Sequence, residues 1–122
     1  MNETGAKPPK TYDRFVAEFP RLGDAWEAMR AAEEEGPFDA RQIRLLKLAV
    51  AVGSGKEGPV HSAVRKARSA GCTDAEIRHV AAIAASTIGL PPAVAAYSWI
   101  VEELDGRRGK GADRAGKGPP EA

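Results

Sequence analysis

Apolar residues recur at helical spacing along most of the chain. The first run begins at Tyr12, follows the i, i+3, i+4, i+7 spacing and stops before Pro20, which predicts a short amphipathic helix. A second helix is expected from Asp24, a capping residue type, to the turn at residues 36–37. Its apolar face holds Trp26 and Met29.

A third helix is predicted from Ala40 to about Val52, with Asp39 as its N-terminal cap. Its apolar residues cover nearly all of its faces, which is typical of a helix in the centre of a bundle or at a contact between subunits. They are Ile43, Leu45, Leu46, Leu48, Ala49, Val50 and Val52.

Three further helices are expected in the second half of the chain. Pro59 suits the first turn of a fourth helix, which Gly71 ends. Residues 73–76 (TDAE) form a capping box for a fifth helix, and residues 89–92 (GLPP) separate it from a sixth. The expected buried faces hold Val60, Ala63, Val64, Ala67 and Ala70, then Ile77, Val80, Ala81, Ala84 and Ile88, and finally Val94, Tyr97, Val101 and Leu104. No hairpin turn separates alternating apolar runs, so the predicted fold class is all-α, a bundle of about six helices.

The ends of the chain differ from its middle in composition. Residues 1–10 and 105–122 contain Gly, Pro and charged residues with very few large apolar side chains. Such segments bury too little surface to offset the entropy lost on ordering. We therefore expect a disordered N-terminus, a folded domain over residues 11–104, and a disordered basic tail.

Charge and composition narrow the class of protein. The 122 residues include 18 basic and 17 acidic side chains, which argues against nucleic acid as the main partner. No apolar run approaches the roughly 18 residues that span a bilayer, and the polar first ten residues lack a signal-peptide core. A single cysteine, Cys72, excludes an internal disulfide and a multi-cysteine zinc site within one chain. The expectation is a soluble, cytoplasmic protein that binds no membrane.

A glycine-rich segment follows the third helix. Gly53, Gly55 and Gly58 match the dinucleotide-binding pattern G-x-G-x-x-G, but that pattern requires a preceding β-strand, and here the preceding run has helical spacing. A phosphate-binding P-loop would need Gly at Val50 and Ser or Thr at Glu57. We interpret the segment as a loop.

Glu57 and His61 lie four residues apart and share one face if Glu57 begins the fourth helix. A carboxylate beside an imidazole raises its basicity and orients it, which produces a general acid/base pair near neutral pH. Ser54 lies near the same end. The alternative is that Glu57 interacts only with the helix dipole and His61 is a satisfied surface or core residue.

Residues 45–97 resemble a known superfamily. The common elements are the LAVA helix, His61 followed by an Ala-rich helix, G-x-T-x-x-E-I at residues 71–77, and G-x-P at residues 89–91. In this order they resemble the carboxymuconolactone decarboxylase and alkylhydroperoxidase accessory-protein (AhpD-like) superfamily. The resemblance implies an AhpD-like helical bundle.

The superfamily divides chemically at the positions seven and four residues before the histidine. Peroxidase-type members carry C-x-x-C there, whereas this chain has Ser54 and Glu57, and Cys72 lies at the far end of the helix. The resemblance therefore favours the decarboxylase type, a carboxy-lyase, over the peroxidase type. In thiol members an acidic residue on the preceding helix assists the histidine, but this chain has Gln42 and Arg44 in that region. Two alternatives remain: a peroxiredoxin-related antioxidant member without the thiols, and a non-catalytic helical oligomer that binds a small ligand.

The predicted site consists of His61 as the acid, Glu57 as its orienting base, and Arg65 and Ser54 as substrate-binding residues. Arg65 lies one turn beyond His61 and is either a carboxylate clamp or part of a solvated face. His79 is interpreted as an interface or surface residue. A metal site formed by Glu57, His61 and His79 is conceivable because the first two have i,i+4 spacing. No residue is a convincing third ligand, and the resemblance implies no metal, so no metal or cofactor is expected.

Self-association is expected on two grounds. The third helix is apolar all round, and Trp99 and Ile100 look exposed in the sixth, so the small domain should bury surface against copies of itself. The resemblance implies a homotrimer or homohexamer with sites at subunit contacts. The other expected partner is a small-molecule substrate.

Overall fold

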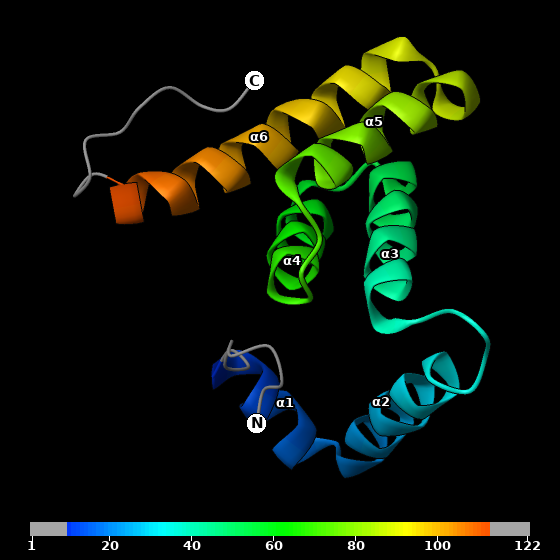
Figure 1. Cartoon of the computed structure of the whole chain (residues 1–122). Helices are drawn as coiled ribbons and strands as arrows, with labels where there is room; N and C mark the ends of the chain where they lie inside the picture. The colour runs from blue at the N-terminus through cyan, green and yellow to red at the C-terminus, as the bar shows by residue number, and fades with distance from the viewer. Residues whose placement is uncertain (1–9, 113–122) are drawn as a thin grey trace.

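The computed structural model describes residues 10–112, and within that range the chain forms six α-helices and no strand (Figure 1). This confirms the all-α prediction. The helices are α1 (Lys10–Glu18), α2 (Pro20–Glu33), α3 (Ala40–Ser54), α4 (Glu57–Ser69), α5 (Asp74–Ile88) and α6 (Leu90–Ala112). The boundary expected at Leu104 falls inside α6. The rest of the expected disordered ends, residues 1–9 and 113–122, lies outside the described range.

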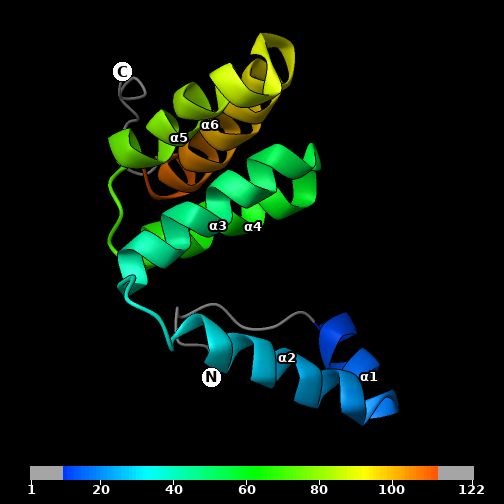
Figure 2. The same cartoon turned by 90° about the vertical axis from the view of Figure 1, so that its right-hand side faces the viewer.

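The last four helices pack as two crossed pairs. α3 lies beside α4 and α5 lies beside α6, and the second pair crosses the first, so that α3 contacts α5 and α4 contacts α6 (Figures 1 and 2). α1 and α2 pack on each other and lie on the side of α3 and α4 that faces away from α5 and α6 (Figure 2). The contact between α4 and α6 positions the candidate site.

Capping residues determine where α3 and α5 begin. Asp39 accepts a hydrogen bond from the Gln42 amide at 2.8 Å, and the Gln42 side chain accepts one from the Asp39 amide at 2.9 Å. Thr73 and Glu76 form the same reciprocal pair at the start of α5. The Glu76 carboxylate also pairs with Arg41, which ties the start of α5 to α3. Both caps confirm the expected boundaries.

The core lies between the two crossed pairs. Its largest fully buried side chains are Leu48, Val52, Val60, Val64, Ile77 and Ile100. The expected faces of α4 and α5 are thus the buried ones, because their stripes point toward α6 and α3. α3 is buried on one side only, and Leu46 and Val50 on its other faces are exposed.

The buried face of α6 differs from the expected one. Ala93, Ala96, Ile100 and Leu104 are buried, whereas Val94 and Tyr97 are exposed. Since α6 packs against both α4 and α5, small alanines on the inner face allow close approach, and the larger Val94 and Tyr97 point outward. The expectation that Ile100 is exposed is therefore wrong: its side chain is fully buried.

The start of α2 also differs from the expectation. The helix begins at Pro20, four residues before Asp24, because proline lacks an amide hydrogen and its fixed φ suits the first helical turn. Asp24 therefore lies inside the helix and does not cap it. Neither α1 nor α2 contains a buried residue in the single chain. Their exposed apolar side chains are Phe15, Phe19, Leu22, Trp26 and Met29.

The glycine-rich segment is a tight turn between two helices. Gly55 ends α3 with φ of 73°, a left-handed conformation that glycine adopts without strain, and Gly53 and Gly58 lie within α3 and α4. A helix, not a strand, precedes the glycines, which agrees with the interpretation as a loop.

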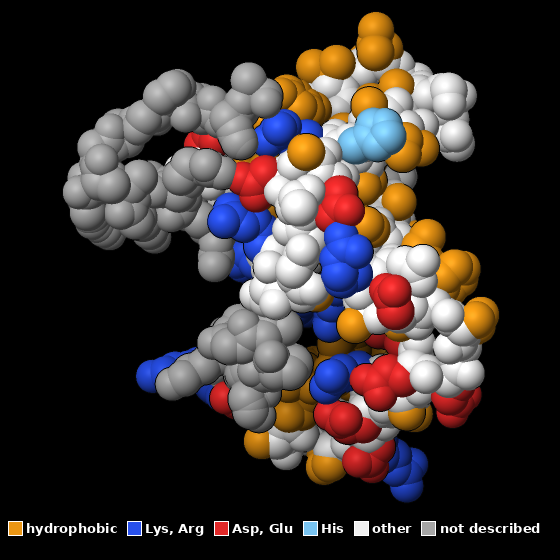
Figure 3. All heavy atoms as spheres, viewed as in Figure 1, with side chains coloured by type: hydrophobic (Ala, Val, Ile, Leu, Met, Phe, Trp, Pro, Cys, Tyr) orange, Lys and Arg blue, Asp and Glu red, His pale blue; other side chains and the backbone are white. Residues whose placement is uncertain are grey.

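Figure 3 shows hydrophobic side chains on the surface of the part formed by α5 and α6. In the described part of the chain, no helix is both long and apolar enough to cross a bilayer.

We expect Thr73→Ala to lower the free energy of unfolding by about 1 kcal/mol, because it removes the acceptor for the Glu76 amide. Urea denaturation followed by circular dichroism at one protein concentration measures the loss. Thr87→Ala, at an exposed position of the same helix, serves as the matched control and should change stability much less. Equal losses in the two variants would contradict the capping role.

Candidate active site

His61 is held between carboxylates from two helices. Its Nδ1 lies 2.8 Å from Oε1 of Glu103 on α6, and its Nε2 lies 3.1 Å from Oε2 of Glu57 on α4. Glu102 on α6 is also close, with Oε1 3.6 Å from Nε2. The i,i+4 spacing on α4 accounts for the contact with Glu57, and the packing of α4 on α6 accounts for the other two.

Glu103 is the least exposed of the three carboxylates. Its side chain is 13% exposed, and the same Oε1 that contacts His61 lies 3.3 Å from a guanidinium nitrogen of Arg65. Arg65 therefore neutralises the charge of the carboxylate that orients the ring. Since a carboxylate can only accept, Nδ1 donates to Glu103, and Nε2 is directed toward Glu57 and Glu102.

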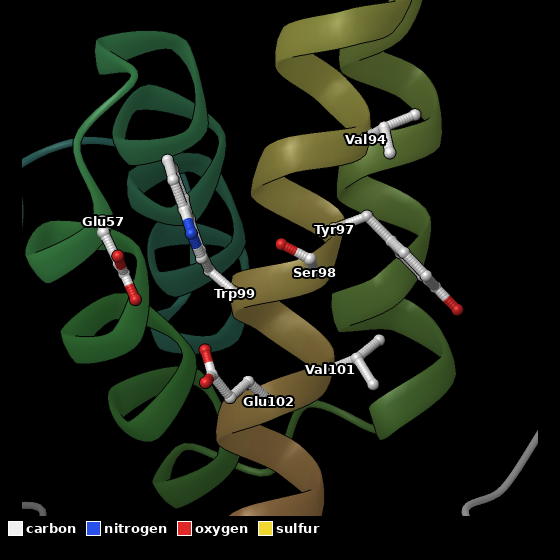
Figure 4. A pocket seen from close by; sticks show the side chains of 7 residues that line it. All are labelled: Glu57, Val94, Tyr97, Ser98, Trp99, Val101 and Glu102. Atoms are coloured by element: carbon white, nitrogen blue, oxygen red, sulfur yellow. The ribbon is translucent and has the colours of Figure 1, made fainter.

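Glu57 and Glu102 lie at the open side of the imidazole. Their side chains are 54% and 65% exposed, compared with 20% for His61. Both line a shallow depression on the outer side of α6 together with Trp99 and Ser98, and the two carboxylates point into the space between α4 and α6 (Figure 4). The remaining lining residues are Val94, Tyr97 and Val101. A small molecule in this depression would meet the carboxylates that surround Nε2.

The surroundings of His61 change its pKa in two directions. Partial burial, the largest single effect, lowers the pKa because it disfavours the charged ring. Hydrogen bonds to Glu103 and then Glu57, together with their negative charges, outweigh this and raise the pKa above its ordinary value. The ring is thus stabilised in its protonated, proton-donating form.

The other residues singled out in the sequence lie in different settings. The Ser54 hydroxyl donates to the Ala51 carbonyl at 2.6 Å in the last turn of α3, and its oxygen accepts from the Lys56 amide at 3.2 Å. Cys72 is buried, and burial raises the pKa of its thiol. His79 is exposed on α5. The substrate-binding roles of Ser54 and Arg65 stay predictions.

Glu102 and Glu103 were not among the site residues expected from the sequence. The carboxylate that assists the histidine was expected on α3, the helix that precedes α4. Gln42 in that helix belongs to the N-terminal cap of α3. The structure places a carboxylate beside the ring from α6. Glu103 lies three residues after Ile100, beside the buried face of α6, and this spacing could have indicated its position. It was overlooked because the face with Val94 and Tyr97 was expected to be the buried one.

One group of ligand-type atoms has the spacing of a metal site in the described residues. Carboxylate oxygens of Glu57 and Glu102 and a ring nitrogen of His61 all lie within 4.8 Å of one another. The third residue of this group is Glu102 and not His79, which was the residue considered from the sequence.

A family model matches most of the described part of the chain. The model of the carboxymuconolactone decarboxylase family matches residues 20–102, more than half of the chain. The chain belongs to the carboxymuconolactone decarboxylase family. The match begins at the start of α2 and ends at Glu102, so it includes Glu57 and His61, whereas Glu103 lies one residue beyond it. Comparisons with curated proteins and with solved structures find no match.

The pKa of His61 in this family member should lie above the ordinary value of about 6.5. A group with a raised pKa in the folded state stabilises the fold fully below its unfolded pKa. This contribution disappears as the pH rises through the raised folded pKa. We therefore expect stability to fall with rising pH across that window, as measured by thermal unfolding in chelator-treated buffer.

A nuclear magnetic resonance titration of the His61 ring measures the same shift directly. His79→Gln leaves a single histidine signal to follow, and Glu103→Gln in that background should lower the His61 pKa because it removes a charged acceptor. An unchanged His61 pKa after Glu103→Gln would refute the role assigned to this contact.

Proposed function

We propose that the protein is a lyase that decarboxylates a small carboxylated lactone, with His61 as the acid and Glu57 as its partner. The observation that carries the proposal is the Nε2 nitrogen of His61, which lies 3.1 Å from Glu57 beside an open depression. Membership of the carboxymuconolactone decarboxylase family supports the reaction class.

The chemistry requires a proton at carbon. The bond between the substrate carboxylate carbon and the ring carbon breaks, CO₂ leaves, and the electron pair delocalises into the lactone carbonyl as an enolate. Protonated His61 then donates the Nε2 proton to carbon, which completes the product and leaves a neutral ring. Glu57, half exposed to solvent, takes up a solvent proton and passes it to Nε2, so each turnover consumes one proton and releases one CO₂.

The charge around His61 restricts the substrate. Three carboxylates, from Glu57, Glu102 and Glu103, face Arg65 and a protonated His61, which leaves one negative charge in excess. This excess disfavours negative charge on the substrate, and each further carboxylate adds to the repulsion. We therefore favour a lactone with a single carboxylate, whose charge departs as CO₂ during the reaction.

The environment of the single cysteine, Cys72, does not favour thiol chemistry. Cys72 is buried, its thiol is directed to the Arg41 carbonyl at 3.6 Å, and burial raises its pKa, so that the reactive thiolate is disfavoured. The peroxidase alternative requires an accessible thiolate.

We expect the purified protein to consume a monocarboxylated butenolide. Loss of ultraviolet absorbance and release of CO₂ measure this consumption. His61→Gln and Glu57→Gln should each lower kcat by about 10²- to 10⁴-fold, because each disrupts proton transfer. 4-Carboxymuconolactone is tested in parallel. It should be consumed more slowly, because it carries an additional negative charge.

His79→Gln and Cys72→Ser are the controls and should retain wild-type turnover, and the protein should consume no hydroperoxide with a dithiol donor. Full turnover in both His61→Gln and Glu57→Gln would refute the site. Absence of turnover with every carboxylated lactone would refute the reaction.

We also propose that the chain assembles with copies of itself. The argument rests on apolar side chains that the single chain leaves in water, among them Val50 on α3 and Val94 on α6, which are 73% and 57% exposed. α1 and α2 bury none of their residues. Apolar surface of this extent on a small protein favours association. A neighbouring copy over α6 would also cover the depression beside Glu57 and Glu102.

Light scattering should give a mass of three or six times the 12.9 kDa chain, as the sequence resemblance implies. Val94→Asp should lower that mass because it places a charge in the contact. Ala75→Asp, in the first turn of α5 where an acid is favourable, should keep the assembly. A monomeric wild-type protein at high concentration would contradict the proposal.

A further inference from the structure

We propose that Glu57, His61 and Glu102 form a binding site for a divalent transition-metal ion of the Zn²⁺ class. The three side chains come from two packed helices, and one nitrogen and two oxygens from them lie within 4.8 Å of one another. The inference goes beyond the proposed decarboxylation, since it concerns binding with no lactone present.

The spacing of the ligand atoms suits a small cation. Two ligands with bonds of 2.0–2.1 Å in a tetrahedral zinc site lie about 3.3 Å apart. The His61 Nε2 nitrogen lies 3.1 Å from the Glu57 oxygen and 3.6 Å from the Glu102 oxygen, on either side of that value. The third pair of ligand atoms, the oxygens of Glu57 and Glu102, lies within 4.8 Å, and both glutamate side chains are exposed, so a bound ion would draw them together.

The far side of the imidazole is already arranged as metal-binding histidines require. A histidine ligand usually donates its other ring N–H to a carboxylate, which fixes the tautomer and raises the basicity of the ligating nitrogen. Here Nδ1 lies 2.8 Å from Glu103, and Arg65 holds the same carboxylate oxygen at 3.3 Å. When Nε2 has lost its proton, its lone pair is therefore directed toward Glu57 and Glu102, so a metal ion and the proton compete for this atom.

The charge of the cluster matches a divalent cation. With a neutral His61, the carboxylates of Glu57, Glu102 and Glu103 against Arg65 leave a net charge of −2. A bound divalent ion balances that charge and relieves the repulsion between neighbouring carboxylates.

The composition of the site selects the class of metal. One imidazole nitrogen with two carboxylates suits Zn²⁺ and its first-row neighbours, whereas Mg²⁺ and Ca²⁺ prefer oxygen-only ligands. Both carboxylates line the open depression (Figure 4), so the remaining coordination position faces solvent. Three protein ligands and one exchangeable position are typical of open zinc sites.

The test is isothermal titration of Zn²⁺ into the full chain, purified without a polyhistidine tag and freed of metal by a chelator. We expect saturable binding of one ion per chain, visible bands with Co²⁺ as the spectroscopic probe, and no comparable binding of Mg²⁺. His61→Gln and Glu102→Gln should each weaken binding at least tenfold. Glu103→Gln should weaken it by about 10- to 100-fold through the orientation of the ring.

His79→Gln and Glu35→Gln are the matched controls, because both residues are exposed and lie outside the cluster. Circular dichroism checks the fold of every variant, and Glu102→Gln, at an exposed position, keeps the test decisive if His61→Gln does not fold. Absence of saturable binding, full affinity in His61→Gln and Glu102→Gln, or equal losses in the controls would overturn the proposal. Lactone turnover is assayed separately with chelator present, so the failure of either proposal is distinguishable from failure of the other.

Discussion

The candidate site depends on the shared contact of Glu103 with His61 and Arg65 across the α4–α6 interface. This carboxylate is largely removed from water, and it has two partners on the facing helix. A partly buried charge is tolerated when it is paired and hydrogen-bonded. The same contact holds the imidazole in one orientation, and therefore the direction of Nε2 depends on how α6 packs on α4.

The fold was largely predictable from the sequence because its signals are local. The capping boxes at Asp39 and Thr73 and the glycines between helices act within a few residues, and the structure has these boundaries. The error at Asp24 arose where two start signals compete, and Pro20 defines the start of α2. The buried face of α6 was mistaken because two of its faces are apolar, and only the packing partners decide which one is buried.

The candidate site was predictable only in part for the same reason. Glu57 and His61 are neighbours along one helix, so their contact follows from spacing. The contacts with Glu102 and Glu103 join residues about forty positions apart, and they depend on the tertiary arrangement of α4 and α6. Family membership places the histidine in a helical bundle, but this chain's α6 carboxylates define its chemical surroundings.

Glu102 and Glu103 are consecutive, yet successive positions on a helix differ by about 100° in direction, so one points outward and the other inward. Glu103 thereby fixes the tautomer of His61, and Glu102, in the same helical turn, lines the depression. Under the proposed function, mutation of Glu102 changes the side of the depression that meets the ligand, while Glu103 keeps the ring oriented. If the proposed function holds, the residue that contacts the ligand can therefore be replaced while the residue that orients His61 is kept.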